Sequence, residues 1–224
     1  MNALKEYIRS KHLWATLTAV VSGSICLLFL PGTLAAILIK ENGLIEIAQC
    51  TGYAAGALIS WSYAKRGIWK GGLNGGTVLL LLALRELDFQ RSFTGISITR
   101  TKFYFSAQVP ILIKVIGGCI ALSMLSALML LIARNTRSLV QGMRERKEWA
   151  FSAASGVILL PVALILDASL RFLEFFGIRA SKEAHLAKTV FEEMTELAIP
   201  SLFLIALIQY GVSASKKARK HSLR

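Results

Sequence analysis

The chain has 224 residues, of which 54% are hydrophobic and only 17% are charged, and its formal net charge is +13. A soluble domain carries about 25% charged residues. The few charges are also bunched, so that long uncharged stretches separate them. This composition excludes a disordered chain, a coiled coil and an ordinary water-soluble enzyme, and it predicts an integral membrane protein.

Six uncharged stretches follow one another along the chain, and their length predicts membrane-spanning helices. A helix needs about 20 apolar residues to cross roughly 30 Å of hydrocarbon. The stretches are continuous rather than alternating, which favours helices over barrel strands. We therefore predict a single all-α domain over residues 1–224, a polytopic bundle of about six transmembrane helices. The predicted spans are about 13–39, 47–64, 71–90, 111–133, 149–170 and 194–215.

The basic residues are divided unevenly between the two sides of this predicted bundle. The side of the two termini holds 16 of the 26 Lys and Arg residues but only 3 of the 13 acids. The positive-inside rule places this side, and with it both termini, in the cytoplasm. We expect a multi-pass protein of the bacterial inner (plasma) membrane, with membrane lipids as partners of its basic face.

A basic tail follows the last predicted span. Residues 216–220 read Lys-Lys-Ala-Arg-Lys, a composition that also occurs in nucleic-acid binding proteins. Because the tail directly follows an apolar run, membrane anchoring is the favoured interpretation, and we expect no nucleic-acid partner.

Small residues four positions apart predict close helix contacts. The pairs are Gly52 with Gly56, Gly71 with Gly75, and Gly72 with Gly76. Such spacing lets two helix backbones approach where lipid supplies no hydrophobic drive. The pattern predicts packing and no particular activity.

Ionisable residues gather at one depth in five of the six predicted helices. At 1.5 Å per residue, the uncharged run 47–64 covers about 27 Å, which puts Glu46 at the outer edge of the hydrocarbon. The same count puts Asp167 there, and the shorter run 71–84 puts Arg85 and Glu86 deeper. Charges at this depth are costly unless they are paired or face water. The candidate polar site therefore comprises Glu46, Arg85, Glu86, Asp88, Lys114, Asp167, Arg171, Glu192 and Glu196.

Two interpretations of this charged ring stay open. In the first, the charges mark helix ends at the membrane rim. In the second, they line a polar pocket open to the outside. Glu192 and Glu196 lie four apart and repel each other, so they need a cation from Arg85, Lys114 or a metal, or else a bound proton.

The histidine count argues against metal chemistry in this ring. Only His185 lies on the outer side, and the chain has no metal-binding or nucleophile motif. We therefore assign no catalytic residue, and we expect no metal and no cofactor.

Three short motifs resemble those of uncharacterised bacterial multi-pass inner-membrane proteins, a resemblance that implies no activity. They are ExGxxE at 41–46, RELDF at 85–89 and EExxE at 192–196. The paired glutamates also resemble the CAAX-protease-like family. That family has Arg four residues after its second Glu, where this chain has Leu197, and it has further helical His residues that are absent here.

Three functions are compatible with these sequence features. The first is a membrane-embedded interaction or accessory protein that packs against another membrane protein or a second copy of itself. The second is an envelope enzyme acting on a lipid or lipid-linked substrate, with carboxylates for acid–base work. The third is a small ion- or proton-coupled transporter. A ring closed by its own ion pairs would favour the first, a cleft open to lipid the second, and a deep aqueous cavity the third.

Overall fold

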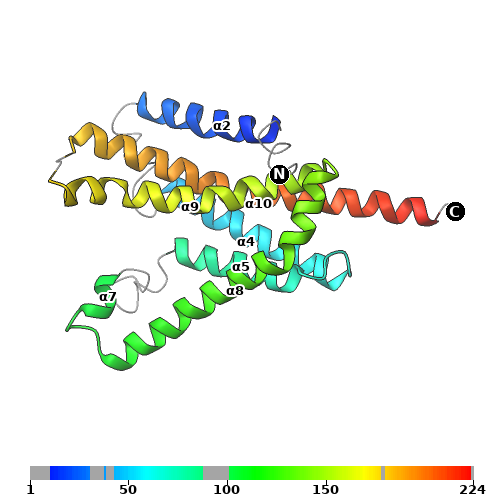
Figure 1. Ribbon diagram of the computed structural model, residues 1–224, viewed down its shortest axis with the longest axis horizontal. Coiled ribbons are helices and arrows are strands. Elements are labelled where there is room, and N and C mark those ends of the chain that lie inside the picture. Colours follow the sequence, from blue (N-terminus) through cyan, green and yellow to red (C-terminus); the bar gives the residue numbers. More distant parts are fainter. Residues whose placement is uncertain (1–10, 31–37, 39–42, 88–100, 178–179, 223–224) are drawn as a thin grey trace. The chain divides into compact units, whose positions relative to one another are not determined.

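The computed structural model describes residues 11–30, 38, 43–87, 101–177 and 180–222. Within these residues the protein contains seven α-helices and no β-strand, so the predicted all-α class is confirmed for this part of the chain (Figure 1). The helices are α2 (Lys11–Leu28), α4 (Leu44–Lys65), α5 (Gly72–Glu86), α7 (Thr101–Phe105), α8 (Ile111–Arg144), α9 (Glu148–Phe175) and α10 (Lys182–Ser222).

Three of these helices are long and apolar enough to cross a membrane. The qualifying segments are Ile111–Arg144, Glu148–Leu170 and Lys182–Ser215, which contain the fourth, fifth and sixth predicted spans. Each helix continues beyond the apolar run that predicted it. Uncharged runs mark only the apolar part of a helix, whereas hydrogen bonding extends the helix into the polar residues on either side.

The first three predicted spans correspond to helices that do not meet this length and hydropathy. In α2 the apolar part is Trp14–Leu28, and most of the remainder of the predicted span 13–39 lies outside the described residues. The α4 helix has 22 residues but includes polar side chains such as Gln49 and Ser60. The α5 helix has 15 residues, about 22 Å at 1.5 Å per residue, which is shorter than the hydrocarbon core.

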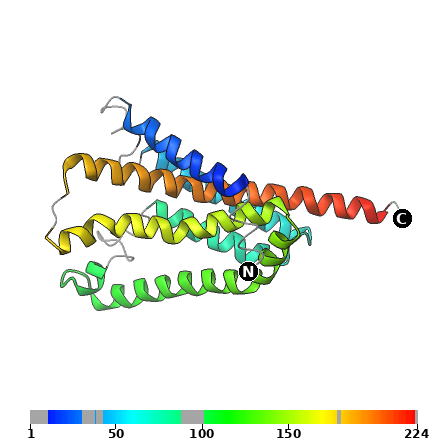
Figure 2. The same cartoon turned by 45° about the horizontal axis from the view of Figure 1, so that its top comes forward.

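The chain divides into two compact units, residues 1–52 with 138–224, and residues 53–137. In the first unit α2, α9 and α10 lie side by side (Figures 1 and 2). The α9 and α10 helices are antiparallel. Their contacts pair Trp149 with Tyr210, Ser152 with Gln209, Gly156 with Phe203 and Asp167 with Lys188, so that residue numbers rise along one helix as they fall along the other.

Small and apolar residues fix α2 and the start of α4 on α10. Leu27, Ile45 and Val190 form a buried cluster. A side chain at Gly52 would lie 3.0 Å from Cβ of Pro200, so this glycine allows the two helices to approach closely. The Gly52 position thus confirms that part of the small-residue prediction.

In the second unit α5 packs tightly on the second half of α4. A Cβ at Gly72 would overlap with the backbone carbonyl oxygen of Ser60, and one at Gly76 would lie 2.5 Å from the indole of Trp61. The turn between the helices is made by Gly67, whose φ of 66° lies in the left-handed region that favours glycine. Together these glycines allow a close helical hairpin.

Candidate functional site

The acidic segment, residues 192–196, lies in α10 about three turns after the start of that helix at Lys182. Ser181 precedes this helix, and its Oγ accepts a hydrogen bond from the N–H of Ala184 at 3.2 Å, which caps the helix start. From this start, residues four apart lie on one face. The cap thereby sets Lys188 and Glu192 one above the other.

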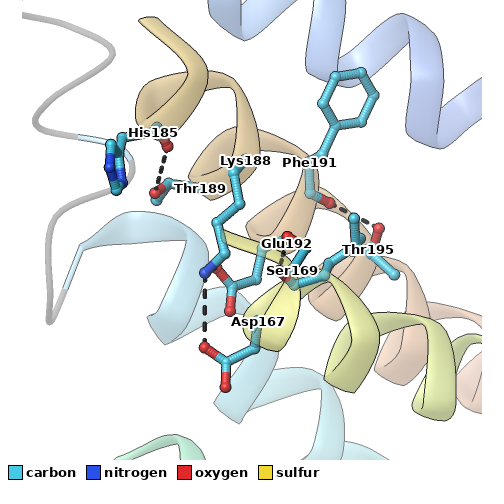
Figure 3. Close-up of polar contacts among 9 residues, drawn as sticks. Asp167, Ser169, His185, Lys188, Thr189, Phe191, Glu192 and Thr195 are labelled. Atoms are coloured by element: carbon cyan, nitrogen blue, oxygen red, sulfur yellow. Dashed lines mark hydrogen bonds and ion pairs between the residues drawn. The ribbon is translucent and has the colours of Figure 1, made fainter. Parts of the chain in front are cut away.

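Lys188 is the centre of the site, because its ammonium group contacts two carboxylates. Its Nζ donates a hydrogen bond to Oε2 of Glu192 and lies 3.6 Å from Oδ1 of Asp167 on α9 (Figure 3). The Lys188 and Glu192 side chains are 18% and 15% exposed, whereas Asp167 is 50% exposed. A largely buried lysine therefore contacts acids from two helices.

A second polar contact joins the same segment of α10 to α4. The side chain of Gln49 is 1% exposed, and its Nε2 donates to both the backbone carbonyl and the carboxylate of Glu193, each at 3.2 Å. Buried amides are costly unless they are hydrogen-bonded. The acidic segment is thus tied to α9 through Lys188 and to α4 through Gln49.

The hydroxyl groups around the ion pair bond within their own helices. Thr189 donates to the carbonyl of His185, Thr195 to that of Phe191, and Ser169 to that of Leu166 (Figure 3). Serine and threonine commonly satisfy their hydroxyls in this way. The link between α9 and α10 in Figure 3 is therefore the ionic one, Lys188 to Asp167.

Some of the nine predicted site residues meet in the structure. Asp167 and Glu192 come together on Lys188. Glu196 follows one turn later on α10, and Glu46 lies in the first turn of α4; both are partly buried. Arg171 lies on α9, but its side chain is outside the described part of the structure.

The other predicted residues belong to the second unit. Arg85 pairs with its neighbour Glu86, Nη2 to Oε1, at 3.4 Å, and the Glu86 side chain is 9% exposed. Lys114 is partly buried in the first turn of α8. Asp88 lies outside the described residues. The ring of charges as a whole stays a prediction.

Two residues that organise the site were not singled out by the sequence. Lys188 precedes Glu192 by four residues, a spacing that could have identified the pair. The same count does not identify Asp167, which reaches Lys188 only through the packing of α9 on α10. Gln49 gives no signal beyond being an amide inside an apolar run.

The site consists of two carboxylates that share one ammonium group. Among the described residues, no three His, Cys, Asp or Glu side chains gather closely enough to hold a metal ion. One ammonium group lies between two carboxylates, so it offsets one of their two negative charges. Comparison with protein-family models, with curated proteins and with solved structures finds no match to this chain.

Proposed function

We propose that this is a six-span protein of the bacterial inner membrane with both termini in the cytoplasm. The three long apolar helices support the membrane assignment. The distribution of Lys and Arg, with 16 of 26 on the side of the termini, supports the orientation. The helices α2, α4 and α5 supply the three additional spans of this proposal, and their shorter apolar segments require packing against neighbours or local bilayer thinning.

Within this membrane setting the protein acts as an embedded accessory protein, and its outer charges have a structural role. The observation that carries this proposal is Lys188, which pairs with Glu192 and contacts Asp167 on the adjacent helix. In this site a cation of the protein itself, rather than a bound substrate or ion, contacts the carboxylates. A general acid or a proton carrier requires instead a carboxylate that changes its protonation state.

Polar groups deeper in α9 and α10 support the same conclusion. The Ser152 hydroxyl lies 3.0 Å from Oε1 of Gln209, and the Ser152 side chain is buried. Hydrogen bonds between helices are a normal adhesive in membranes. The large apolar side chains of α8, such as Leu112 and Leu122 at 68% and 65% exposure, provide a surface for lipid or another membrane protein.

An enzyme acting on lipid-linked substrates and an ion-coupled transporter are the alternatives, and Glu192→Gln separates them from the accessory role. Gln keeps the shape of Glu but removes its charge and its titration. For a structural pair we expect a lower thermal midpoint in detergent, with in-cell function falling only in proportion to the amount of folded protein. The matched control is Glu183→Gln, at an exposed position at the start of α10.

The in-cell measurement is complementation of a deletion strain, normalised to the folded protein recovered from membranes. A Glu192→Gln protein that is as stable as the parent but inactive would contradict the structural role and favour catalysis or transport. Glu196→Gln, compared in the same two assays, tests in the same way the acid that lies four residues after Glu192.

A further inference from the structure

Five basic side chains gather at one end of the second unit, and we call them the basic cluster. They come from the last residue of α4, from the turn between α4 and α5, and from α8 at the point where its uncharged run stops. All five side chains are exposed. The members are Lys65, Arg66, Lys70, Arg134 and Arg137.

A hydrogen bond between side chains joins these two segments. The indole N–H of Trp69 donates to Oδ1 of Asn135 at 3.3 Å, and the Asn135 amide donates to the carbonyl of Leu131 at 2.8 Å. Lys70 adjoins Trp69, and Arg134 adjoins Asn135. The hydrogen bond joins residues that are 66 apart in sequence, and each of the two has a cation as its neighbour in the chain.

Two glycines hold the Trp69 ring in place. A Cβ at Gly71 would lie 2.9 Å from the indole nitrogen, and one at Gly75 would overlap with the ring edge. The turn itself is fixed by backbone hydrogen bonds from the N–H groups of Ile68 and Trp69 to the carbonyl of Tyr63, at 2.9 and 3.3 Å. The cations thus project from an ordered turn.

The positive charge of the basic cluster is not compensated nearby. Among the described residues of the second unit the one acid is Glu86, which follows the start of α5 by about 21 Å at 1.5 Å per residue. Among the described residues, none of the five cations has a carboxylate partner. By contrast, Lys147 in the turn between α8 and α9 pairs with Glu145.

The basic cluster lies where three uncharged runs end. The uncharged run 47–64 ends at Lys65, the run 71–84 starts after Lys70, and the run 115–133 ends at Arg134. Apolar helices that stop together at a group of cations and a tryptophan mark the boundary between hydrocarbon and headgroups. We propose that the basic cluster binds the phosphate of an anionic phospholipid headgroup, whose acyl chains lie along the adjoining apolar helices.

This inference requires that the chain is embedded in a bilayer, as proposed above, but it does not depend on the accessory role. The test uses the full chain in dodecyl maltoside with phosphatidylglycerol and phosphatidylcholine of identical acyl chains. Native mass spectrometry measures the bound lipids. We expect the parent protein to retain phosphatidylglycerol in preference to phosphatidylcholine.

The decisive variant is Lys65→Gln/Arg66→Gln/Lys70→Gln. Because each cation near an anionic lipid contributes to binding, we expect a loss of about fivefold in phosphatidylglycerol affinity per removed charge, with phosphatidylcholine unchanged. Arg134→Gln/Arg137→Gln should act in the same direction from the other segment. The circular dichroism spectrum and the thermal midpoint of each variant report whether it is folded. The single variant Lys70→Gln, at an exposed position, keeps the test valid if the triple variant is unstable.

The matched control is Arg144→Gln/Arg146→Gln/Lys147→Gln, which removes three charges from a turn that already holds Glu145 and Glu148. This control should retain the lipid preference. Equal losses in both triple variants, or no loss in the first, would overturn the site. Competition by inorganic phosphate as strong as that by the lipid would assign a free-anion site and overturn the lipid assignment. Because this measurement involves neither Glu192 nor in-cell function, it can fail while the accessory role stands, and the reverse.

Discussion

At Lys188 one ammonium group serves two carboxylates that lie on different helices. Removing a charged group from water is costly, and only close partners and hydrogen bonds repay that cost. The largely buried Lys188 and Glu192 therefore depend on each other more than the half-exposed Asp167 depends on either. Loss of the Lys188 cation should therefore cost more free energy at Glu192 than at Asp167.

We expect Lys188→Met to lower the free energy of unfolding by about 2 kcal/mol, because it leaves the Glu192 carboxylate without its charged donor. Met fills a similar volume, so the change reports on charge rather than on packing. Thermal unfolding in detergent measures the effect. Lys182→Met, at an exposed position at the start of α10, is the control and should change little. Equal stability of Lys188→Met and the parent would show that the ion pair contributes nothing.

The sequence predicted part of this arrangement through depth. Counting residues along the uncharged runs placed Asp167 and Glu196 at a similar level, and Glu192 joined the predicted site because it lies four residues before Glu196. The structure brings Asp167 and Glu192 onto a single lysine. The spacing of Lys188 and Glu192 could have identified their pair, but the contact of Lys188 with Asp167 could not be predicted, because it joins two different helices. Only the packing of α9 against α10 selects Asp167. Gln49 was missed for a similar reason, since its hydrogen bonds to Glu193 join segments 144 residues apart.

At the scale of the helices, small residues and single hydrogen bonds determine how closely neighbours approach. The glycine pairs in the sequence predicted close contacts, and Gly52, Gly72 and Gly76 make them. The sequence could not say which helix each glycine faces. It also gave no indication that Gly71 and Gly75 pack against Trp69, a residue of the preceding turn.

Gly72→Ala tests the hairpin of α4 and α5. An alanine favours an isolated helix over glycine by about 1 kcal/mol. Here its Cβ would overlap with the Ser60 carbonyl oxygen, which belongs to the backbone and cannot move aside. We expect a net destabilisation of about 1–3 kcal/mol, measured by thermal unfolding. Gly118→Ala is the control, because its nearest neighbour, Cε1 of Tyr104, lies at 3.8 Å. A Gly72→Ala protein as stable as this control would contradict the close contact.

The bond between Ser152 and Gln209 tests the pairing of α9 with α10. A double-mutant cycle with Ser152→Ala and Gln209→Leu isolates the energy that the two side chains share. Interhelical hydrogen bonds in membrane proteins contribute about 0.6 kcal/mol on average, and we expect a coupling of that size. Additive effects of the two substitutions on unfolding in detergent would show that the 3.0 Å contact adds no stability.

At the scale of the whole molecule, the apolar runs predicted the helical class but not the extent of each helix. The last three runs correspond to helices long enough to cross a membrane, whereas α5 has only 15 residues. A run of uncharged residues does not distinguish a full span from a shorter buried helix, because burial by neighbouring protein and burial by lipid select the same side chains. The number of spans therefore needs a direct measurement.

Reporter fusions test the proposed six-span topology. The uneven distribution of basic residues predicts that a reporter at residue 224 is cytoplasmic and that one inserted within residues 87–110 is periplasmic. Paired phosphatase and fluorescent-protein fusions at each site distinguish the two compartments. Phosphatase activity from the C-terminal fusion would contradict the orientation, and reporters on the same side at both sites would contradict an odd number of spans between them.

The antiparallel contacts of α9 and α10 also bear on how the protein is made. Four contacts share one register, so a slide of one helical turn, about 5.4 Å, would break all of them together. Phe175 ends the first helix and Lys182 begins the second, so the two emerge from the ribosome in immediate succession. A nascent hairpin in this register brings Asp167 beside the Lys188–Glu192 pair, so that these charges enter the lipid partly compensated rather than one at a time. We therefore expect α9 and α10 to insert as a unit, because each helix lowers the cost of placing the other's charged side chain in the bilayer.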